Sequence, residues 1–163
     1  MPCIKASQIA AKTTMKRQHA LITNRYSIEG KNMRVTRLDH LVLTVKDIEA
    51  SVDFYQRVLG MKKSVFGQGR IALSFGDQKI NLHQAGAEFE PKANLATPGS
   101  ADLCFVVSHN IEEVINHLNA LEVEIIEGPV LRTGATGRIN SVYIRDPDLN
   151  LLELSEYLPA CAL

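Results

Sequence analysis

DHLVLTVKDIEASVDFYQRVLGM (Asp39–Met61) and ADLCFVVSHNIEEVINHLNALEV (Ala101–Val123) are two copies of one pattern. Each begins with alternating apolar residues, passes through a polar turn and continues into an amphipathic helix that starts on Ile-Glu. With one residue of slack at the turn, His40 aligns with Asp102. The chain therefore contains an internal duplication.

The ends of the two copies also correspond. KINLHQ (79–84) matches LLELSE (151–156), which aligns Asn81 with Glu153 and His83 with Ser155. The first and last strands of each copy thus carry polar residues at equivalent positions. This pattern suggests a site built about a pseudo-twofold axis.

Length and charge restrict the class of protein. A chain of 163 residues with 45% hydrophobic content predicts one globular domain with a tail. The net charge is zero, yet residues 1–37 hold eight Lys or Arg and one acid, Glu29. Residues 38–163 therefore hold ten bases against seventeen acids, which argues against a nucleic-acid partner. No apolar run approaches the roughly 18 residues of a membrane span, so we expect no membrane partner.

The composition of the N-terminal residues and the cysteines bear on localisation. Residues 1–36 are basic and poor in acids, and we predict a disordered extension there. The same composition is typical of a mitochondrial presequence, so we expect cytoplasmic localisation with the mitochondrial matrix as the alternative. Cys3, Cys104 and Cys161 are odd in number and scattered. They predict a reducing compartment without a structural disulfide.

The periodicity predicts an α+β fold of two tandem βαβββ modules that form a curved eight-stranded sheet around an internal cleft. The domain spans 37–157, with module one at 37–84, a connector at 85–100, module two at 101–157 and a tail at 158–163. Module one has strands at 38–45, 62–67, 70–75 and 79–83 and a helix at 48–58, capped by Asp47 and ended by Gly60. Module two has strands at 101–107, 122–126, 139–145 and 150–155 and a helix at 110–120.

LDHLVLTVKDIEASVDFYQRVLGM followed by RDPDLNLLELSEY resembles the vicinal oxygen chelate superfamily, which includes glyoxalase I, extradiol dioxygenases and bleomycin-resistance proteins. FGDQKINLHQAGAEFEPKA and EGPVLRTGATG are similar to a small vertebrate branch of glyoxalase domain-containing proteins. The resemblance covers residues 37–157. It implies a homodimer, a small-molecule substrate and one divalent metal ion, held by the first and last strands of each module.

Carried over by position, the implied metal ligands are His40, Asn81, Asp102 and Glu153. Asp102 stands where the family usually has histidine, and Asn81 stands where glyoxalase I has Gln or Glu. Because residues two apart in a strand share a face, His83 is a further candidate beside Asn81. We therefore expect His40, His83, Asp102 and Glu153 to bind the metal, with Asn81 as the alternative to His83. The metal can be Zn, Ni, Mn or Fe, since sequence alone does not choose among them.

Three functions follow from the resemblance. The leading one is a metal-dependent glyoxalase-like lyase or isomerase, in which the metal chelates adjacent substrate oxygens and stabilises an enediolate or enolate. By the resemblance, Glu153 is the expected catalytic base of this reaction. An extradiol-type dioxygenase would use His40, His83 and Glu153 to hold iron. The third function is a non-catalytic small-molecule-binding module of the bleomycin-resistance type. For all three functions, the sequence leaves open whether the cleft lies within one chain or between two chains.

The candidate residues also have structural explanations. His40 can be a satisfied strand histidine, Asp102 can cap a turn, and His83 can be a surface residue at a strand end. Arg132 and Arg138 flank the TGATG loop, where they can meet an anionic substrate or remain solvated. Cys104 shares a strand face with Asp102 and can line the cleft or fill space.

Overall fold

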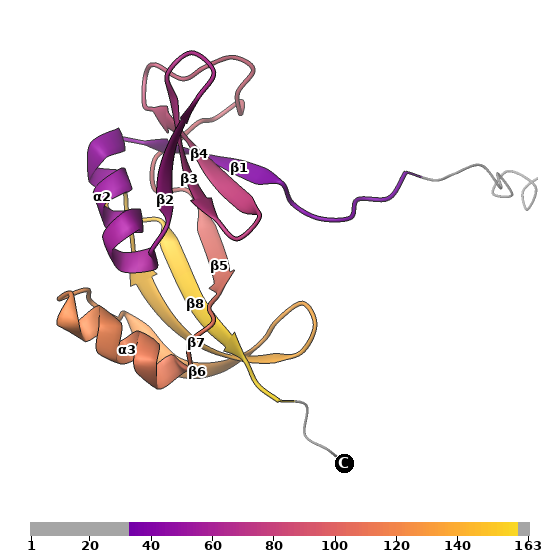
Figure 1. Ribbon diagram of the computed structural model, residues 1–163, viewed down its shortest axis with the longest axis vertical. Helices are drawn as coiled ribbons and strands as arrows, with labels where there is room; N and C mark the ends of the chain where they lie inside the picture. The colour runs from indigo at the N-terminus through magenta and orange to yellow at the C-terminus, as the bar shows by residue number, and fades with distance from the viewer. Residues whose placement is uncertain (1–32, 160–163) are drawn as a thin grey trace, which may run out of the picture. The chain divides into compact units, whose positions relative to one another are not determined.

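The computed structural model describes residues 33–159, drawn as a ribbon in Figure 1. The chain divides into two units, Met1–Arg37 and Leu38–Leu163. The predicted extension over residues 1–36 falls largely outside the described residues and stays a prediction. No helix within residues 33–159 is long and apolar enough to cross a membrane. The second unit has the predicted α+β fold with two βαβββ modules.

Module one forms a mixed four-stranded sheet with one helix. Its elements are β1 (His40–Val45), α2 (Ile48–Leu59), β2 (Lys62–Phe66), β3 (Arg70–Phe75) and β4 (Gln78–Gln84). The strand order is β1-β4-β3-β2. β1 and β4 are parallel, whereas β4, β3 and β2 are joined by tight antiparallel hairpins. Gly76 has φ +51° in the second hairpin, a conformation that other residues rarely adopt.

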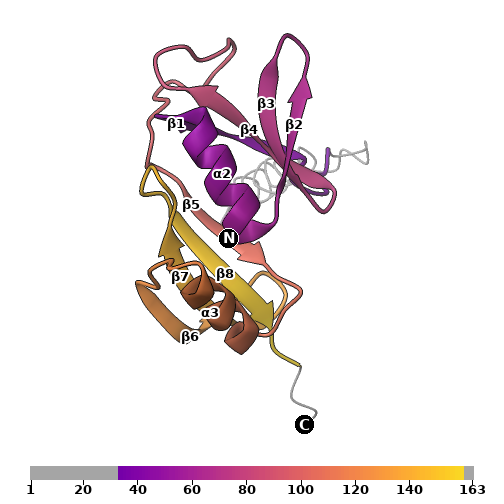
Figure 2. The same ribbon diagram turned by 60° about the vertical axis from the view of Figure 1, so that its left-hand side comes forward.

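Module two repeats this arrangement. Its elements are β5 (Asp102–Val106), α3 (Ile111–Ala120), β6 (Glu127–Thr133), β7 (Arg138–Arg145) and β8 (Leu151–Tyr157). The strand order is β5-β8-β7-β6, with β5 and β8 parallel and the remaining pairs antiparallel. In Figure 2 α2 lies against the first sheet and α3 against the second.

The strand registers confirm the duplication. His40 pairs with Lys79 across β1 and β4, and Asp102 pairs with Leu151 across β5 and β8. Lys79 and Leu151 are the first residues of the two matching hexapeptides. The two modules therefore agree in pairing as well as in element order.

Two sequence predictions need correction. The eight strands form two separate sheets of four and not one eight-stranded sheet, because the first strand of each module pairs with the last strand of the same module. The strand predicted at 122–126 is wrong, and the strand lies at Glu127–Thr133. Glu122 has φ +55° and the Val123 amide still bonds the Leu118 carbonyl, so the end of α3 extends into the predicted strand.

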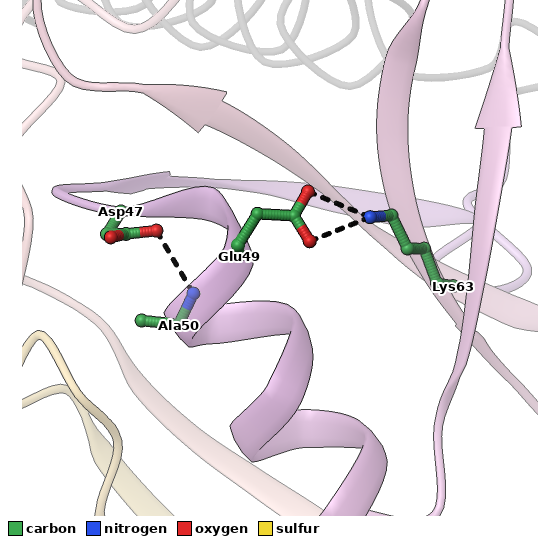
Figure 3. A network of polar contacts seen from close by, with 4 residues as sticks. All are labelled: Asp47, Glu49, Ala50 and Lys63. Carbon is green, nitrogen blue, oxygen red and sulfur yellow. Dashed lines mark hydrogen bonds and ion pairs between the residues drawn. The ribbon is translucent and has the colours of Figure 1, made fainter.

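Both helices begin at residues with capping side chains. Asp47 accepts a 3.0 Å hydrogen bond from the Ala50 amide at the start of α2. In the same first turn, Glu49 accepts hydrogen bonds at both carboxylate oxygens from Lys63 of β2, at 2.8 and 2.9 Å (Figure 3). Asn110 and Glu113 form a reciprocal capping box at the start of α3. These local signals fix where each helix begins.

The hydrophobic core lies between the helices and one face of each sheet. The alternation in β1 buries Leu43 and Val45 and directs His40, Val42 and Thr44 to the other face. Val58 of α2 and Leu118 of α3 belong to one continuous apolar cluster with the sheet residues. Nε2 of His117 lies 2.9 Å from the Val58 carbonyl, a direct polar contact between the helices of the two modules.

The DPDLN turn (146–150) provides a second polar connection between the modules. Asp146 is buried and accepts hydrogen bonds from the amides of Asp148 and Asn150 and from the Asn150 side chain. Its Oδ2 also accepts a 2.9 Å bond from the Tyr55 hydroxyl of α2. Asp148 accepts bonds from the Lys46 amide at 3.1 and 3.2 Å. The turn residues therefore have a structural role in joining the modules.

Candidate functional site

Each sheet has one face turned away from its helix, and these faces carry the candidate residues. Strand pairing defines the first polar face as His40, Val42, Thr44, Lys62, Ser64, Phe66, Arg70, Ala72, Ser74, Lys79, Asn81 and His83. It defines the second polar face as Asp102, Cys104, Val106, Glu127, Val130, Arg132, Ile139, Ser141, Tyr143, Arg145, Leu151, Glu153, Ser155 and Tyr157. Four of the five predicted ligand positions lie at a strand start or centre on these faces, and His83 lies near the end of β4.

Two buried oxygens stand out among the described residues. Asn81 Oδ1 and Glu153 Oε1 are buried side-chain atoms without a hydrogen-bond partner. Such atoms are rare in native proteins, since each loses its hydration without replacement. The two residues occupy equivalent positions of the duplication, Asn81 beside Val42 and Glu153 beside Cys104. Each module therefore directs one unsatisfied oxygen onto its polar face.

The histidines differ in their surroundings. His40 is the first residue of β1 and its side chain is 45% exposed, with Nδ1 2.8 Å from Oδ1 of Asp39. His83 is 7% exposed, and its ring meets Phe89 edge-to-face at 5.6 Å between centroids. Burial, followed by the positive charge of Arg70, lowers the pKa of His83. His83 is therefore a neutral imidazole near pH 7, the form that binds metals.

The carboxylates lie on the second sheet. Asp102 is the exposed first residue of β5, and Glu153 is half-buried at the centre of β8. Glu153 pairs with Cys104 on one side and with Tyr143 on the other. Burial, with a contribution from the Glu153 charge, raises the pKa of the Tyr143 hydroxyl, although the Arg132 hydrogen bond acts against it. Tyr143 therefore remains a neutral hydroxyl beside the carboxylate.

Glu153 faces a pocket of about 430 Å³ on the second polar face. Arg132 lines the pocket; its Nε donates to the Tyr143 hydroxyl at 3.1 Å and its Nη2 donates to Glu127 at 2.5 Å. The remaining lining residues are Cys104, Val106, Thr133, Gly134, Ala135, Ile139 and Tyr157. The pocket thus places a carboxylate, a phenol and a guanidinium beside an apolar wall, which suits a small polar substrate.

Residues 33–159 do not bring the predicted metal ligands into one group. Within this range no three His, Cys, Asp or Glu side chains gather closely enough to hold a metal ion. His40, Asn81 and His83 lie on the first polar face, whereas Asp102 and Glu153 lie on the second. The donor chemistry nevertheless fits a divalent ion, because a neutral imidazole and two unsatisfied oxygens are what such an ion binds. The ligand set therefore stays a prediction.

Several site residues were missed by sequence reasoning. Tyr143 and Tyr157 line the pocket through the β7–β8 pairing, which could have been found by extending the alternation from Glu153 to the neighbouring strand. Arg132 lies in the pocket as one prediction allowed, but Arg138 does not line it. Ile139, Ser141 and Tyr143 occupy the polar face, so the alternation of β7 directs Arg138 to the opposite face. Phe89 had no sequence signal, because the connector has no periodicity, and Arg70, although it begins a predicted strand, was not singled out.

Comparison with known proteins agrees with the fold. Virulence protein STM3117 of Salmonella typhimurium is 56% identical over 130 residues, which cover 80% of this chain and 90% of that protein. Its crystal structure superposes with a TM-score of 0.76 and covers 77% of this chain and all of the solved one. Glyoxalase domain-containing protein RDO1 of Mycosarcoma maydis is 55% identical over 132 residues, 81% of this chain and 74% of that protein.

A lactoylglutathione lyase from Agrobacterium tumefaciens has the same fold, with 24% identity, a TM-score of 0.59 and coverage of 76% of this chain and 95% of that one. The family model described as Glyoxalase/Bleomycin resistance protein/Dioxygenase superfamily matches residues 37–154, nearly the whole of both modules. With a match of this length and relatives above half identity, the chain belongs to the glyoxalase/bleomycin resistance/dioxygenase superfamily.

Proposed function

We propose that this protein is a metal-dependent enzyme of the glyoxalase type, a lyase or isomerase acting on a small substrate with adjacent oxygens. The observation that carries the proposal is the pair of unsatisfied oxygens, Asn81 Oδ1 and Glu153 Oε1, at equivalent positions of the two modules. A buried acceptor without a partner costs free energy, so its retention at both positions favours a bound group that completes it. Superfamily membership supports the same function.

The proposed ligands are His40, Asp102, Glu153 and either His83 or Asn81. A divalent ion bound there would act as a Lewis acid toward adjacent substrate oxygens. Glu153 is proposed to take the proton next to the substrate carbonyl, because its carboxylate borders the pocket and keeps an oxygen free of internal hydrogen bonds. The neutral Tyr143 hydroxyl is in place to orient that carboxylate.

Substitution of Glu153 tests the proposal. Glu153→Gln keeps the shape of the side chain and removes the base, and Glu156→Gln on the same strand but the opposite face is the matched control. Two measurements are needed: bound metal by elemental analysis, and exchange of the substrate α-proton in deuterium oxide, with the hemithioacetal of methylglyoxal and glutathione as probe. We expect exchange to fall by roughly a hundredfold to ten-thousandfold in Glu153→Gln only. Full metal content and full exchange in that variant would overturn the role of Glu153.

We also propose that the working site forms between two copies of the chain. The candidate ligands are divided between two sheets, and the polar faces expose apolar side chains, including Val42 at 45%, Val106 at 60% and Tyr157 at 38%. A second copy would cover such residues and bring the first polar face of one chain to the second polar face of its partner.

Mixing two inactive variants tests this assembly. His40→Ala removes a ligand from module one and Glu153→Gln removes one from module two. If sites form across chains, each mixed dimer regains one intact site, so activity returns on mixing. If both modules of one chain make the site, no mixed dimer has an intact site and the mixture stays inactive. Light scattering of the unmodified protein gives the oligomeric state independently.

One observation favours a second function, oxygen-dependent ring cleavage of the extradiol type. His83 is buried and its lowered pKa keeps it neutral, so His40, His83 and Glu153 would offer two imidazoles and a carboxylate to iron. Loading the protein with Fe²⁺ under nitrogen and adding catechol with oxygen tests it. Oxygen uptake that depends on His83 would favour this function over the glyoxalase type. If neither oxygen uptake nor α-proton exchange is detected, a non-catalytic binding module is favoured.

A further inference from the structure

The first polar face carries cations but no carboxylates. Its twelve residues include Lys62, Arg70 and Lys79 together with His40 and His83, and none is Asp or Glu. Elsewhere in the described chain, several cations are in ion pairs, such as Lys63 with Glu49 and Arg132 with Glu127. A face with positive charge alone attracts anions.

Two of these cations lie over aromatic rings. The Arg70 guanidinium carbon lies 4.6 Å from the centroid of the Phe89 ring, and Lys79 Nζ lies 4.0 Å from the centroid of the Phe66 ring. Contact with a ring face orients a cation without neutralising it. Among the ion pairs of residues 33–159, none includes Arg70 or Lys79. Both cations are therefore positioned and keep their charge.

The two rings line a single hollow of about 350 Å³ at the tip of the β2–β3 hairpin. Phe66, Gly67, Gln68, Arg70, Phe89 and Glu90 form its wall. The one carboxylate there, Glu90, is 76% exposed and lies 4.0 Å from Lys92. The hollow thus offers a guanidinium beside two phenyl rings.

The nearby connector is held in place by its own charges. Glu88 accepts a 2.8 Å bond from Lys92 and a 2.9 Å bond from the Gly86 amide, which lower the pKa of Glu88 to about 2. The Glu88 carboxylate is therefore already paired. Phe89, the next residue, contacts both the Arg70 guanidinium and the His83 ring. Phe89 thus links the hollow to His83, which lies on the same strand and face as Asn81.

We propose that Arg70, seated on Phe89 and supported by Lys79, binds a carboxylate group of the substrate whose apolar part lies against Phe66 and Phe89. A guanidinium offers two parallel N–H donors that match the two oxygens of a carboxylate, and the rings favour an apolar or aromatic neighbour. This inference deepens the proposed function and rests on it for the claim that the bound anion is the substrate. The binding itself is independent of metal and turnover.

Benzoate is the probe, because it combines a carboxylate with a ring. The Phe89 ring protons report on the site, because Phe89 lines the hollow and the Arg70 guanidinium lies over its ring. We expect benzoate to shift the Phe89 ring resonances in a saturable way, followed by NMR in the full chain. Sodium chloride at the same ionic strength controls for screening, and inorganic phosphate tests for a general anion site.

Four variants complete the test. Arg70→Met and Arg70→Lys are expected to weaken benzoate binding by roughly tenfold or more, the second because lysine keeps the charge but loses the paired donors. Lys79→Met is expected to weaken it less. Arg57→Met is the matched control, because Arg57 lies on α2 and pairs with Asp53. Circular dichroism verifies that each variant is folded.

No shift of the Phe89 ring resonances with benzoate, or an undiminished shift in both Arg70 variants, would overturn the site. An equal response to phosphate would overturn the assignment to carboxylates. The two proposals can fail separately. If Glu153→Gln has no effect on proton exchange but benzoate binding depends on Arg70, the proposed enzyme function is rejected and the carboxylate site remains. If Glu153→Gln abolishes exchange but benzoate does not bind, the carboxylate site is rejected and the proposed function remains.

Discussion

The Tyr55 hydroxyl of α2 donates a 2.9 Å hydrogen bond to Oδ2 of Asp146, a residue 91 positions later in the chain. Tyr55 is fully buried and Asp146 is 3% exposed. This bond and the Lys46 amide bonds to Asp148 tie the helix and first strand of module one to the last turn of module two. The modules are therefore connected by polar contacts as well as by the shared core.

Loss of the Tyr55 hydroxyl should destabilise the protein. Tyr55→Phe removes the hydroxyl that donates to the buried Oδ2 of Asp146. We therefore expect the free energy of unfolding to fall by about 1–3 kcal/mol. Urea denaturation followed by circular dichroism measures it. Tyr157→Phe is the control, because the Tyr157 side chain is 38% exposed and should change stability by less than about 0.5 kcal/mol. Equal stability of the Tyr55→Phe and unmodified proteins would contradict the structural role of this bond.

The same tyrosine predicts a dependence of stability on alkaline pH. Burial, followed by the charge of Asp146 and its hydrogen bond, raises the pKa of Tyr55 above its usual value of 10.0. Below pH 10 both the folded and the unfolded states keep the proton, so the contribution is fully present. Above pH 10 the unfolded state loses the proton first, and stability falls. Thermal melting between pH 9 and 11 should show a steeper fall for the unmodified protein than for Tyr55→Phe; parallel curves would refute the prediction.

The cap of α2 gives a local prediction. Asp47→Ala removes the acceptor for the Ala50 amide, and we expect a loss of about 0.5–2 kcal/mol in unfolding free energy. Asp53→Ala on the same helix is the control, since that exposed residue makes only an i,i+4 ion pair with Arg57. The measurement is chemical denaturation of both variants. A similar small effect of the two substitutions would show that the cap contributes little.

Much of the fold could be predicted from particular residues. Asp47 and Gly60 bound α2 as the capping pattern indicates, and the alternation of β1 separates Leu43 and Val45 from His40 and Thr44. The alignment of Asn81 with Glu153 also singled out the two residues whose oxygens lack a partner. Local signals of this kind act within a few residues of each other, so a single sequence records them.

The remaining features depend on contacts between distant segments. Tyr143 borders Glu153 only because β7 and β8 pair in one register, and Phe89 reaches His83 only because the aperiodic connector folds back. The strand at Glu127–Thr133 was missed because it begins with a bulge around Gly128. An added Cβ at Gly128 would lie 2.6 Å from the Ser141 carbonyl oxygen, a constraint set by the neighbouring strand.

His83 should make the protein less stable at mildly acidic pH. Because burial and Arg70 lower its folded-state pKa, the unfolded state binds the proton more readily. The contribution of neutral His83 to the free energy of unfolding is fully present above pH 6.5, the ordinary pKa of histidine. It is lost as the pH falls toward the lowered pKa of the folded state. Melting temperatures from pH 8 to 5 should fall less in His83→Gln than in the unmodified protein. His109→Gln, an exposed residue, is the control and should retain the full fall.

The unsatisfied oxygen of Glu153 predicts a trade between stability and function. Glu153→Met fills similar space without a buried acceptor, so the metal-free protein should gain about 1–3 kcal/mol in unfolding free energy. If Glu153 serves the proposed metal site, the same variant should bind less metal and lose activity, as is common when a functional residue is replaced by a better-packed one. Glu156→Met, at the opposite face of β8, controls for the general effect of removing a carboxylate. Calorimetric melting with and without added Zn²⁺ measures the stability and the metal binding, and the proton-exchange assay measures the activity. A variant that is destabilised in the absence of metal would mean that Glu153 has an internal partner and a structural role.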